Sequence, residues 1–195
     1  MVLERFKERK GPLRKALEEC MRKGPVLKKL REQFFRAVTR VYDADRFHVS
    51  LLDDIKNAKN FVVVISPFLN RLRVQKFISA REVREAIERG VDIIVVTRLP
   101  EPKKVSDVKE HEDCIEALRK AGLKVVTVKE PTLHFKAVII DNEIIYLGSI
   151  NPLSILTYRE IPADYMIRFE SEALVDEIIE NAIGKEVYEQ WLGLK

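Results

Sequence analysis

Cysteine is scarce in this sequence, and its two copies are poorly placed for a shared role. Cys20 and Cys114 lie far apart and in unlike contexts. A disulfide framework or a structural zinc site would need more cysteines, so neither is expected. We therefore expect reduced thiols, as in the cytoplasm.

Long apolar runs are also missing. No stretch approaches the roughly 20 apolar residues that cross a bilayer. The first fifteen residues contain no apolar segment of the kind found in secretory signals, and the acidic residues Glu4, Glu8, Glu18 and Glu19 argue against a transit peptide. We expect a cytoplasmic location and no membrane partner.

Charge is present in abundance but unevenly distributed. Apolar residues make up 46% of the 195, enough for a buried core, and the net charge is +4. Residues 1–40 contain 13 Lys or Arg against 5 Glu, whereas the remainder is net negative. This basic segment indicates a polyanionic partner, first of all nucleic acid, although a solvated basic helix face gives the same pattern.

The sequence predicts two regions with different periodicity. Residues 1–42 are expected to form a basic helical extension, with helices at about 13–22 and 26–41, each preceded by Gly-Pro. The second of these helices has an apolar face that must pack against the main domain or a partner. Residues 43–195 are expected to form the catalytic domain.

Within residues 43–195, apolar runs alternate with helical patterns. The expected strands are 61–65, 91–96, 123–128, 135–140, 144–147 and 165–169, and the expected helices are 48–58, 80–88, 105–120, 152–157 and 174–190. This order predicts a layered α/β/α fold with a mixed, largely parallel sheet. The strand pair around residues 141–143 makes the sheet mixed.

Two basic side chains with the spacing of neighbours on one strand face indicate phosphate chemistry. His134 and Lys136 are two residues apart, and Val138 and Ile140 continue their face into the core. A neutral imidazole beside an ammonium group can bind a phosphate and attack it.

A polar loop follows the second strand of this pair. Gly148 and Ser149 begin a loop before an expected helix, where a hydroxyl and backbone N–H groups can hold an anion. Asn151 adds a further polar donor.

Together these residues resemble the HxKxxxxDxxxxxxGSxN signature of the phospholipase D superfamily. All six specified positions match with the correct spacing: His134, Lys136, Asp141, Gly148, Ser149 and Asn151. The resemblance extends over roughly residues 46–190 and leaves the basic extension outside.

The resemblance implies a mechanism that needs no metal and no other cofactor. His134 would attack phosphorus and form a covalent phosphohistidine, while a second motif histidine protonates the leaving oxygen. Lys136 and Asn151 would stabilise the charged oxygens, with help from Ser149.

An acidic residue should orient the histidine, and the resemblance offers two candidates. Asp164 fits the position before the last strand better than Glu160, although the family more often has Glu there. Asp141 is expected to organise the turn, and Gly148 to have a structural role.

Four residues outside the motif are second-rank candidates for substrate contact. Arg98, Arg71, Arg73 and Ser66 follow expected strands on the side where α/β proteins usually place their sites. Surface arginines and an ordinary turn are equally compatible with these positions. His111 is expected at a solvated helix start.

A single motif points to two chains. No second His-x-Lys occurs in the sequence, and single-motif members of this size resemble the dimeric endonuclease branch. We therefore expect a homodimer with one shared site. Alternatively, the chain is a fragment of a larger helicase-like protein, or its partner.

Three functions remain open, in this order. A metal-independent endonuclease is favoured by the single motif and the basic segment, with DNA ranked above RNA. A phospholipid phosphodiesterase or transferase uses the same residues. A non-catalytic nucleic-acid-binding module would use the motif only to hold phosphate.

Overall fold

The computed structural model describes residues 39–102, 105–129, 133–154 and 164–194. The chain divides into two compact units, of which the second is Arg40–Lys195. The helix predicted at 13–22 lies outside the described residues. The helix predicted at 26–41 is wrong at its end, because Thr39–Tyr42 form a strand.

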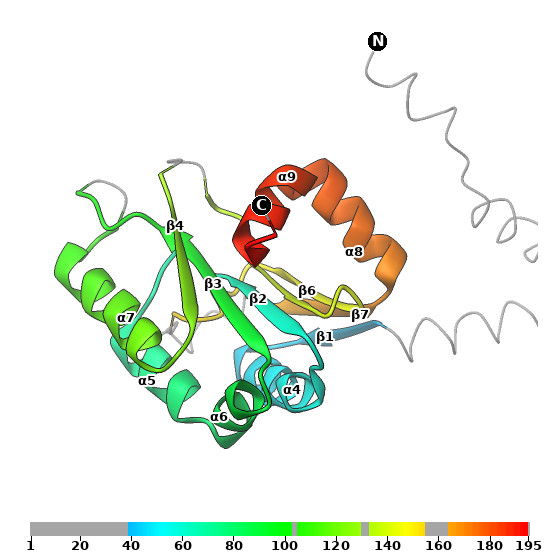
Figure 1. Ribbon diagram of the computed structural model, residues 1–195, viewed down its shortest axis with the longest axis horizontal. Coiled ribbons are helices and arrows are strands. Elements are labelled where there is room, and N and C mark those ends of the chain that lie inside the picture. The colour runs from blue at the N-terminus through cyan, green and yellow to red at the C-terminus, as the bar shows by residue number, and fades with distance from the viewer. Residues whose placement is uncertain (1–38, 103–104, 130–132, 155–163, 195) are drawn as a thin grey trace, which may run out of the picture. The chain divides into compact units, whose positions relative to one another are not determined.

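A seven-stranded sheet forms the centre of this unit, in the order β1-β7-β6-β5-β2-β3-β4 (Figure 1). The strands are β1 (Thr39–Tyr42), β2 (Phe61–Ile65), β3 (Asp92–Arg98), β4 (Lys124–Val128), β5 (Ala137–Ile140), β6 (Ile144–Gly148) and β7 (Met166–Glu170). The three central strands β2, β3 and β5 are buried over most of their length, as their uninterrupted runs of Val and Ile predict.

The sheet is mixed, as expected, but its parallel part is smaller than predicted. Strands β2, β3 and β4 are parallel to one another. The pairs β2/β5, β5/β6 and β6/β7 are antiparallel. The sequence shows where strands occur, but β5 joins the sheet beside β2 in the reverse direction, and this pairing depends on contacts distant in sequence.

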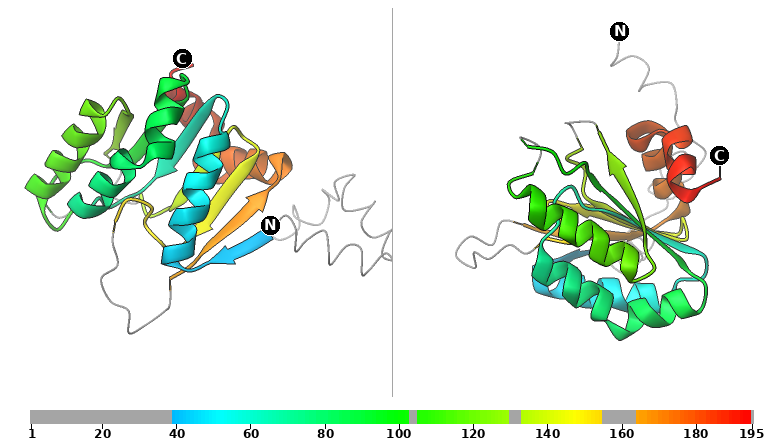
Figure 2. Two further views of the ribbon diagram at one scale, coloured as in Figure 1. Left: turned by 90° about the horizontal axis from the view of Figure 1, so that it is seen from below. Right: turned by 60° about the vertical axis from the view of Figure 1, so that its left-hand side comes forward.

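Helices cover both faces of the sheet, which confirms the predicted α/β/α layers (Figures 1 and 2). One layer contains α4 (Ala44–Asn57), α5 (Arg71–Ser79), α6 (Arg81–Glu88) and α7 (Val108–Lys120), and the other contains α8 (Glu172–Ile178), the π-helical segment η1 (Ile179–Ile183) and α9 (Lys185–Leu192). Each layer packs on its own apolar cluster. None of the described helices is both long and apolar enough to span a bilayer.

Two helices differ from the sequence prediction. Helix α5 was not expected, although Asn70 provides a clear N-cap whose side chain accepts from the backbone N–H of Arg73. The helix predicted at 174–190 is interrupted at Gly184, which has a φ of +91°. Residues 155–157 of the helix predicted at 152–157 lie outside the described residues, and Pro152 to Ser154 form a turn.

A buried polar network ties α4 to the strands that carry the site. The guanidinium of Arg168 donates to both carboxylate oxygens of Asp54, at 2.7 and 3.0 Å. The hydroxyl of Tyr146 also donates to Asp54 and lies 2.8 Å from the hydroxyl of Ser50. Burial raises the pKa of Tyr146, so its hydroxyl remains a donor. Strands β6 and β7 are thereby fixed against α4.

Candidate active site

The start of β5 and the end of β6 meet at one edge of the sheet. Ala137, the first residue of β5, pairs with Ile65 at the end of β2, and Gly148 at the end of β6 pairs with Met166 at the start of β7. This edge is also where the parallel strands β2 and β3 end, the usual place for a site in an α/β protein.

An open cleft of about 690 Å³ lies at this edge. Its lining residues are His134, Phe135, Lys136, Leu147, Gly148, Ser149, Asp164 and Tyr165. Residues from two distant stretches of the motif and from the segment before β7 therefore share one surface.

His134 and Lys136 differ in their environments. Both precede β5, which begins one residue later than Lys136, and not at 135 as predicted. His134 is exposed, whereas Lys136 is only 8% exposed and donates its ammonium proton to the carbonyl of His134 at 2.8 Å. The cleft therefore offers an accessible imidazole above a largely buried cation.

The charge on Lys136 is sensitive to its surroundings. Burial lowers the pKa of Lys136, and the positive charge of Arg98 lowers it further, while the carboxylate of Asp164 opposes the shift. A partly desolvated ammonium interacts more strongly with an anion than one in water does.

Gly148 allows β6 and β7 to approach closely. A Cβ atom at this position would overlap the carbonyl oxygen of Tyr165 and lie 2.9 Å from the Cα of Met166. The next residue, Ser149, is bonded to the same neighbour twice: its N–H donates to the Tyr165 carbonyl at 3.0 Å, and its hydroxyl accepts from the Tyr165 N–H at 3.1 Å. These contacts hold Asp164 and Tyr165 beside the motif.

Asn151 lies in the loop after Ser149, and hydrogen bonds with Ser66 and Arg73 hold this loop in place. The N–H of Leu153 donates to the hydroxyl of Ser66 at 3.0 Å, and the Nε of Arg73 donates to the carbonyl of Pro152 at 3.4 Å. The side-chain oxygen of Asn151 is buried and has no hydrogen-bond partner among the described residues. Buried amide oxygens are normally paired, so this one has capacity for a further donor.

Ser66 and Arg73 support this loop and are not among the residues that line the cleft. Ser66 is fully buried and also donates its hydroxyl proton to the carbonyl of Phe68 at 2.8 Å. Burial lowers the pKa of Arg73 to about 10. Both side chains are bonded to the loop behind the cleft, and direct substrate contact by Ser66 and Arg73 stays a prediction.

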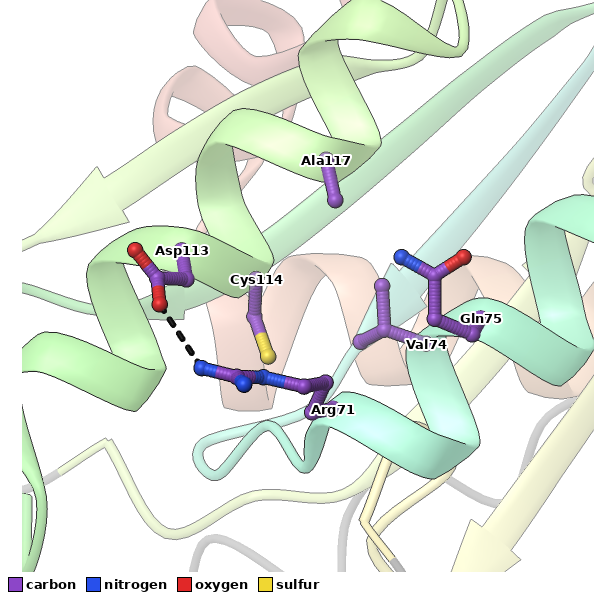
Figure 3. Close-up of a pocket in the computed structure, with 6 residues that line it drawn as sticks. All are labelled: Arg71, Val74, Gln75, Asp113, Cys114 and Ala117. Carbon is purple, nitrogen blue, oxygen red and sulfur yellow. Dashed lines mark hydrogen bonds and ion pairs between the residues drawn. The ribbon is translucent and has the colours of Figure 1, made fainter.

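The side chain of Arg71 lies against helix α7 and not in the cleft. Its guanidinium forms an ion pair with Asp113 of α7 at 2.8 Å and lines a separate small pocket beside Cys114 (Figure 3). Burial raises the pKa of the Cys114 thiol to about 11, so it is a poor nucleophile. Arg71 is not among the residues that line the cleft, and its contact with substrate stays a prediction.

Arg98 is bonded to the residue that directly precedes His134. Its Nε donates to the carbonyl of Leu133 at 2.8 Å, one residue before His134, and its guanidinium lies 4.5 Å from the centre of the Phe68 ring. Its charge reaches Lys136, as the pKa effect above indicates.

His111 supports the backbone of Arg98, and its expected solvated position is wrong. It is 2% exposed, and its Nε2–H donates to the Arg98 carbonyl at 3.0 Å and lies 3.2 Å from the hydroxyl of Thr97. Burial lowers the pKa of His111, which favours the neutral ring. Helix α7 thus fixes the end of β3.

Asp141 lies at the opposite end of β5, in the turn to β6. Its carboxylate accepts from the backbone N–H groups of Lys59, Asn60 and Phe61 at 2.7 to 2.9 Å. Its φ of +51° is a left-handed conformation that Asp tolerates better than most residues. This motif residue organises a turn and has no contact with the cleft.

The acid that orients His134 stays a prediction. Asp164 lines the cleft and acts electrostatically on Lys136, but no hydrogen bond joins it to His134 in the described ranges. Glu160 lies outside the described residues.

Three cleft residues were missed by the sequence reasoning: Phe135, Leu147 and Tyr165. Phe135 and Leu147 adjoin motif positions and Tyr165 adjoins the candidate acid Asp164, so proximity to the candidate residues was the available signal. In the part of the chain that the structure describes, no group of three or more His, Cys, Asp or Glu side chains could hold a metal ion.

Comparison with known proteins agrees with this architecture. The family model described as cardiolipin synthase, PLD-like domain, matches residues 51–182. The crystal structure of Nuc from Salmonella typhimurium, described as a phospholipase D family member, aligns over 78% of this chain and 94% of its own, with 17% identity and a TM-score of 0.58.

A second structure, NucT from Helicobacter pylori, covers 77% of this chain and 95% of its own, with 16% identity and a TM-score of 0.54. At these identities the likenesses establish the fold. No curated protein matches the sequence.

Proposed function

The chain belongs to the phospholipase D superfamily, and from this premise we propose that it is a metal-independent nuclease that cleaves phosphodiester bonds through a phosphohistidine. The observation that carries the proposal is the cleft in which His134, Lys136, Gly148 and Ser149 lie together. Phosphodiesterase activity is common to the superfamily. The proposal adds the substrate, nucleic acid, and the catalytic residues.

In the proposed reaction, His134 is the nucleophile. Its exposed imidazole attacks phosphorus while the P–O bond to the leaving strand breaks, and a phosphohistidine forms. Water then attacks phosphorus, the P–N bond breaks, and the histidine is released. Lys136 and Asn151 stabilise the negative charge on the non-bridging oxygens, and Ser149 helps to position them.

A second histidine must supply the leaving oxygen with a proton and then activate water. The other histidines of the sequence are poorly placed for this: His111 is buried in α7, and His48 belongs to α4. We propose that a second copy of the chain provides its own His134, so that two subunits share one site.

Nucleic acid is the proposed substrate, with DNA ranked above RNA. The concentration of Lys and Arg in residues 1–40 supports a polyanion, and contacts to the phosphate backbone would give little sequence specificity. A phospholipid is the second candidate, because the description of the matching family model names a lipid enzyme.

The test is cleavage in EDTA. Wild-type protein, His134→Ala and the matched control His48→Gln would be incubated with end-labelled single- and double-stranded DNA, RNA, and vesicles containing anionic phospholipid. We expect nucleic-acid cleavage that falls by about 1,000-fold or more in His134→Ala and persists in His48→Gln.

Other outcomes separate the alternatives. Equal cleavage by wild type and His134→Ala would remove His134 from the mechanism. Lipid turnover without nucleic-acid cleavage would favour the second candidate, and binding without any turnover would favour a non-catalytic module.

Subunit mixing tests the shared site. Wild-type and His134→Ala chains would be co-expressed in varied ratios, and activity per total protein measured. If two histidines from two chains are needed, activity follows the square of the wild-type fraction, because mixed dimers are inactive. A linear dependence would mean that each chain works alone.

A further inference from the structure

One exposed aromatic side chain stands at the edge of the cleft. The large apolar residues exposed in the described ranges are Val41, Val49, Leu72, Tyr165, Val187 and Leu194. Of these, Tyr165 alone lines the cleft with His134 and Lys136, and it is 48% exposed. What distinguishes Tyr165 from the other five is its place in the lining of the cleft, beside His134 and Lys136.

The backbone of Tyr165 is held rigidly on both sides. Its N–H and its carbonyl are both bonded to Ser149, as described above. The following residue, Met166, is fully buried at the start of β7 and packs where Gly148 lacks a side chain. The ring is therefore presented by a fixed frame, which reduces the entropy lost when a ligand contacts it.

The lining of the cleft combines polar and charged side chains with apolar and aromatic ones. Leu147 pairs with Ile167 of β7, and Tyr165 directly precedes the first residue of that strand. Phe135 also lines the cleft and packs with one of the two apolar clusters.

A nucleotide likewise combines a charged part with a flat apolar part. Its phosphate fits His134 and Lys136, and its base presents a π-face that stacks on aromatic rings. In a duplex both faces of each base are covered by neighbouring bases, so no face is available to Tyr165. A base in a single strand has a free face.

We propose that Tyr165 stacks on the nucleobase beside the scissile phosphate and that the preferred substrate is therefore single-stranded. This inference rests on the proposed nuclease function and extends it to a substrate class. Base–aromatic stacking of this kind corresponds to a change of about tenfold or more in binding.

The test pairs a change in the protein with a change in the substrate. A short single-stranded oligonucleotide would contain one cleavable linkage among uncharged methylphosphonates, with a base or an abasic sugar beside that linkage. Wild type, Tyr165→Ala, Tyr165→Phe and the control Leu72→Ala, an exposed apolar residue of α5, would be compared by kcat/KM.

We expect Tyr165→Ala to reduce kcat/KM on the base-containing substrate by about tenfold, with the advantage of that substrate over the abasic one reduced in the same proportion. Tyr165→Phe retains the ring and should keep that advantage, as should Leu72→Ala. Wild type should also cleave single strands faster than a duplex of the same sequence.

Three results would overturn the inference. Equal losses on both substrates would mean that Tyr165 only positions other groups, and equal rates on single and double strands would contradict the substrate class. Loss of the dimer in Tyr165→Ala, measured by sedimentation, would assign the ring to a subunit interface. Cleavage by His134→Ala would instead overturn the proposed function itself.

Discussion

The two ends of β5 carry residues of the same motif but differ in how their polar groups are satisfied. At the turn end, the carboxylate of Asp141 accepts three backbone hydrogen bonds from the segment that leads into β2. At the cleft end, His134 is exposed, Lys136 is desolvated, and the side-chain oxygen of Asn151 lacks a partner among the described residues.

This difference separates structure from chemistry within one signature. Polar groups whose bonding capacity is filled by the protein stabilise the fold. Polar groups that the protein leaves without hydrogen-bond partners lower the stability of the fold, and these are the groups that a substrate can bind. The substitutions below test whether this division holds.

Among the substitutions that compare the two ends of β5, Lys136→Met should give the largest effect, and on activity alone. In the proposed reaction Lys136 stabilises the charged oxygens of the transition state, so removing this cation should lower kcat by about 100- to 1,000-fold. Stability should be unchanged or slightly higher, because Met fills a similar volume without a desolvated charge. Phosphodiesterase kinetics and urea unfolding check both parts; a large loss of stability would place Lys136 with the structural residues.

Gly148→Ala should reduce both stability and activity, because Gly148 is the motif residue at which β6 packs closely against β7. The added Cβ would meet the Tyr165 carbonyl and force β6 and β7 apart, with an expected cost of about 3 kcal/mol or more. Displacement of Asp164 and Tyr165 should also reduce activity at temperatures where the variant is folded. Normal stability and activity together would show that the strands can separate without consequence.

Asp141→Ala should affect stability alone. It removes a carboxylate bonded to three N–H groups and leaves Ala at a φ of +51°, which together should cost about 2–4 kcal/mol. Asp141→Asn keeps the tolerance of that backbone and one acceptor oxygen, so it should lose less. Thermal unfolding gives the comparison, and kcat of the folded variants should match wild type within about twofold, against the roughly 100-fold or greater loss in Lys136→Met.

The smallest effect concerns pH. Because burial and Arg98 lower the pKa of Lys136, the alkaline limb of kcat/KM should lie below that of an ordinary lysine at 10.5. Asp164→Asn removes the charge that opposes this shift, so the limb should move to still lower pH. If the alkaline limb of kcat/KM did not move in Asp164→Asn, a group other than Lys136 would control it.

The same shift has a consequence for stability. The unfolded state holds the Lys136 proton more tightly than the folded state does, so this group should make stability rise with pH between its lowered pKa and 10.5. Lys136→Met should remove that rise, which unfolding curves at several pH values can measure.

Local patterns account for the parts of the fold and site that the sequence predicted. The Val- and Ile-rich runs gave β2 and β3, since strands covered on both faces need apolar side chains at every position. The six motif residues were found by their spacing. Helix α5 was missed because only Val74 and Phe77 are buried in it, too few for a clear helical period.

By itself, the sequence determined the layered α/β class, most strand positions and the motif, because these depend on residue order and short-range periodicity. The tertiary structure alone decided the reverse pairing of β5 with β2, which turned a largely parallel prediction into a sheet with three antiparallel pairings. It also decided that Ser66 and Arg73 brace a loop, that His111 is buried, and that Tyr165 faces the cleft. Each of these depends on contacts between segments far apart in the chain, which no local pattern encodes.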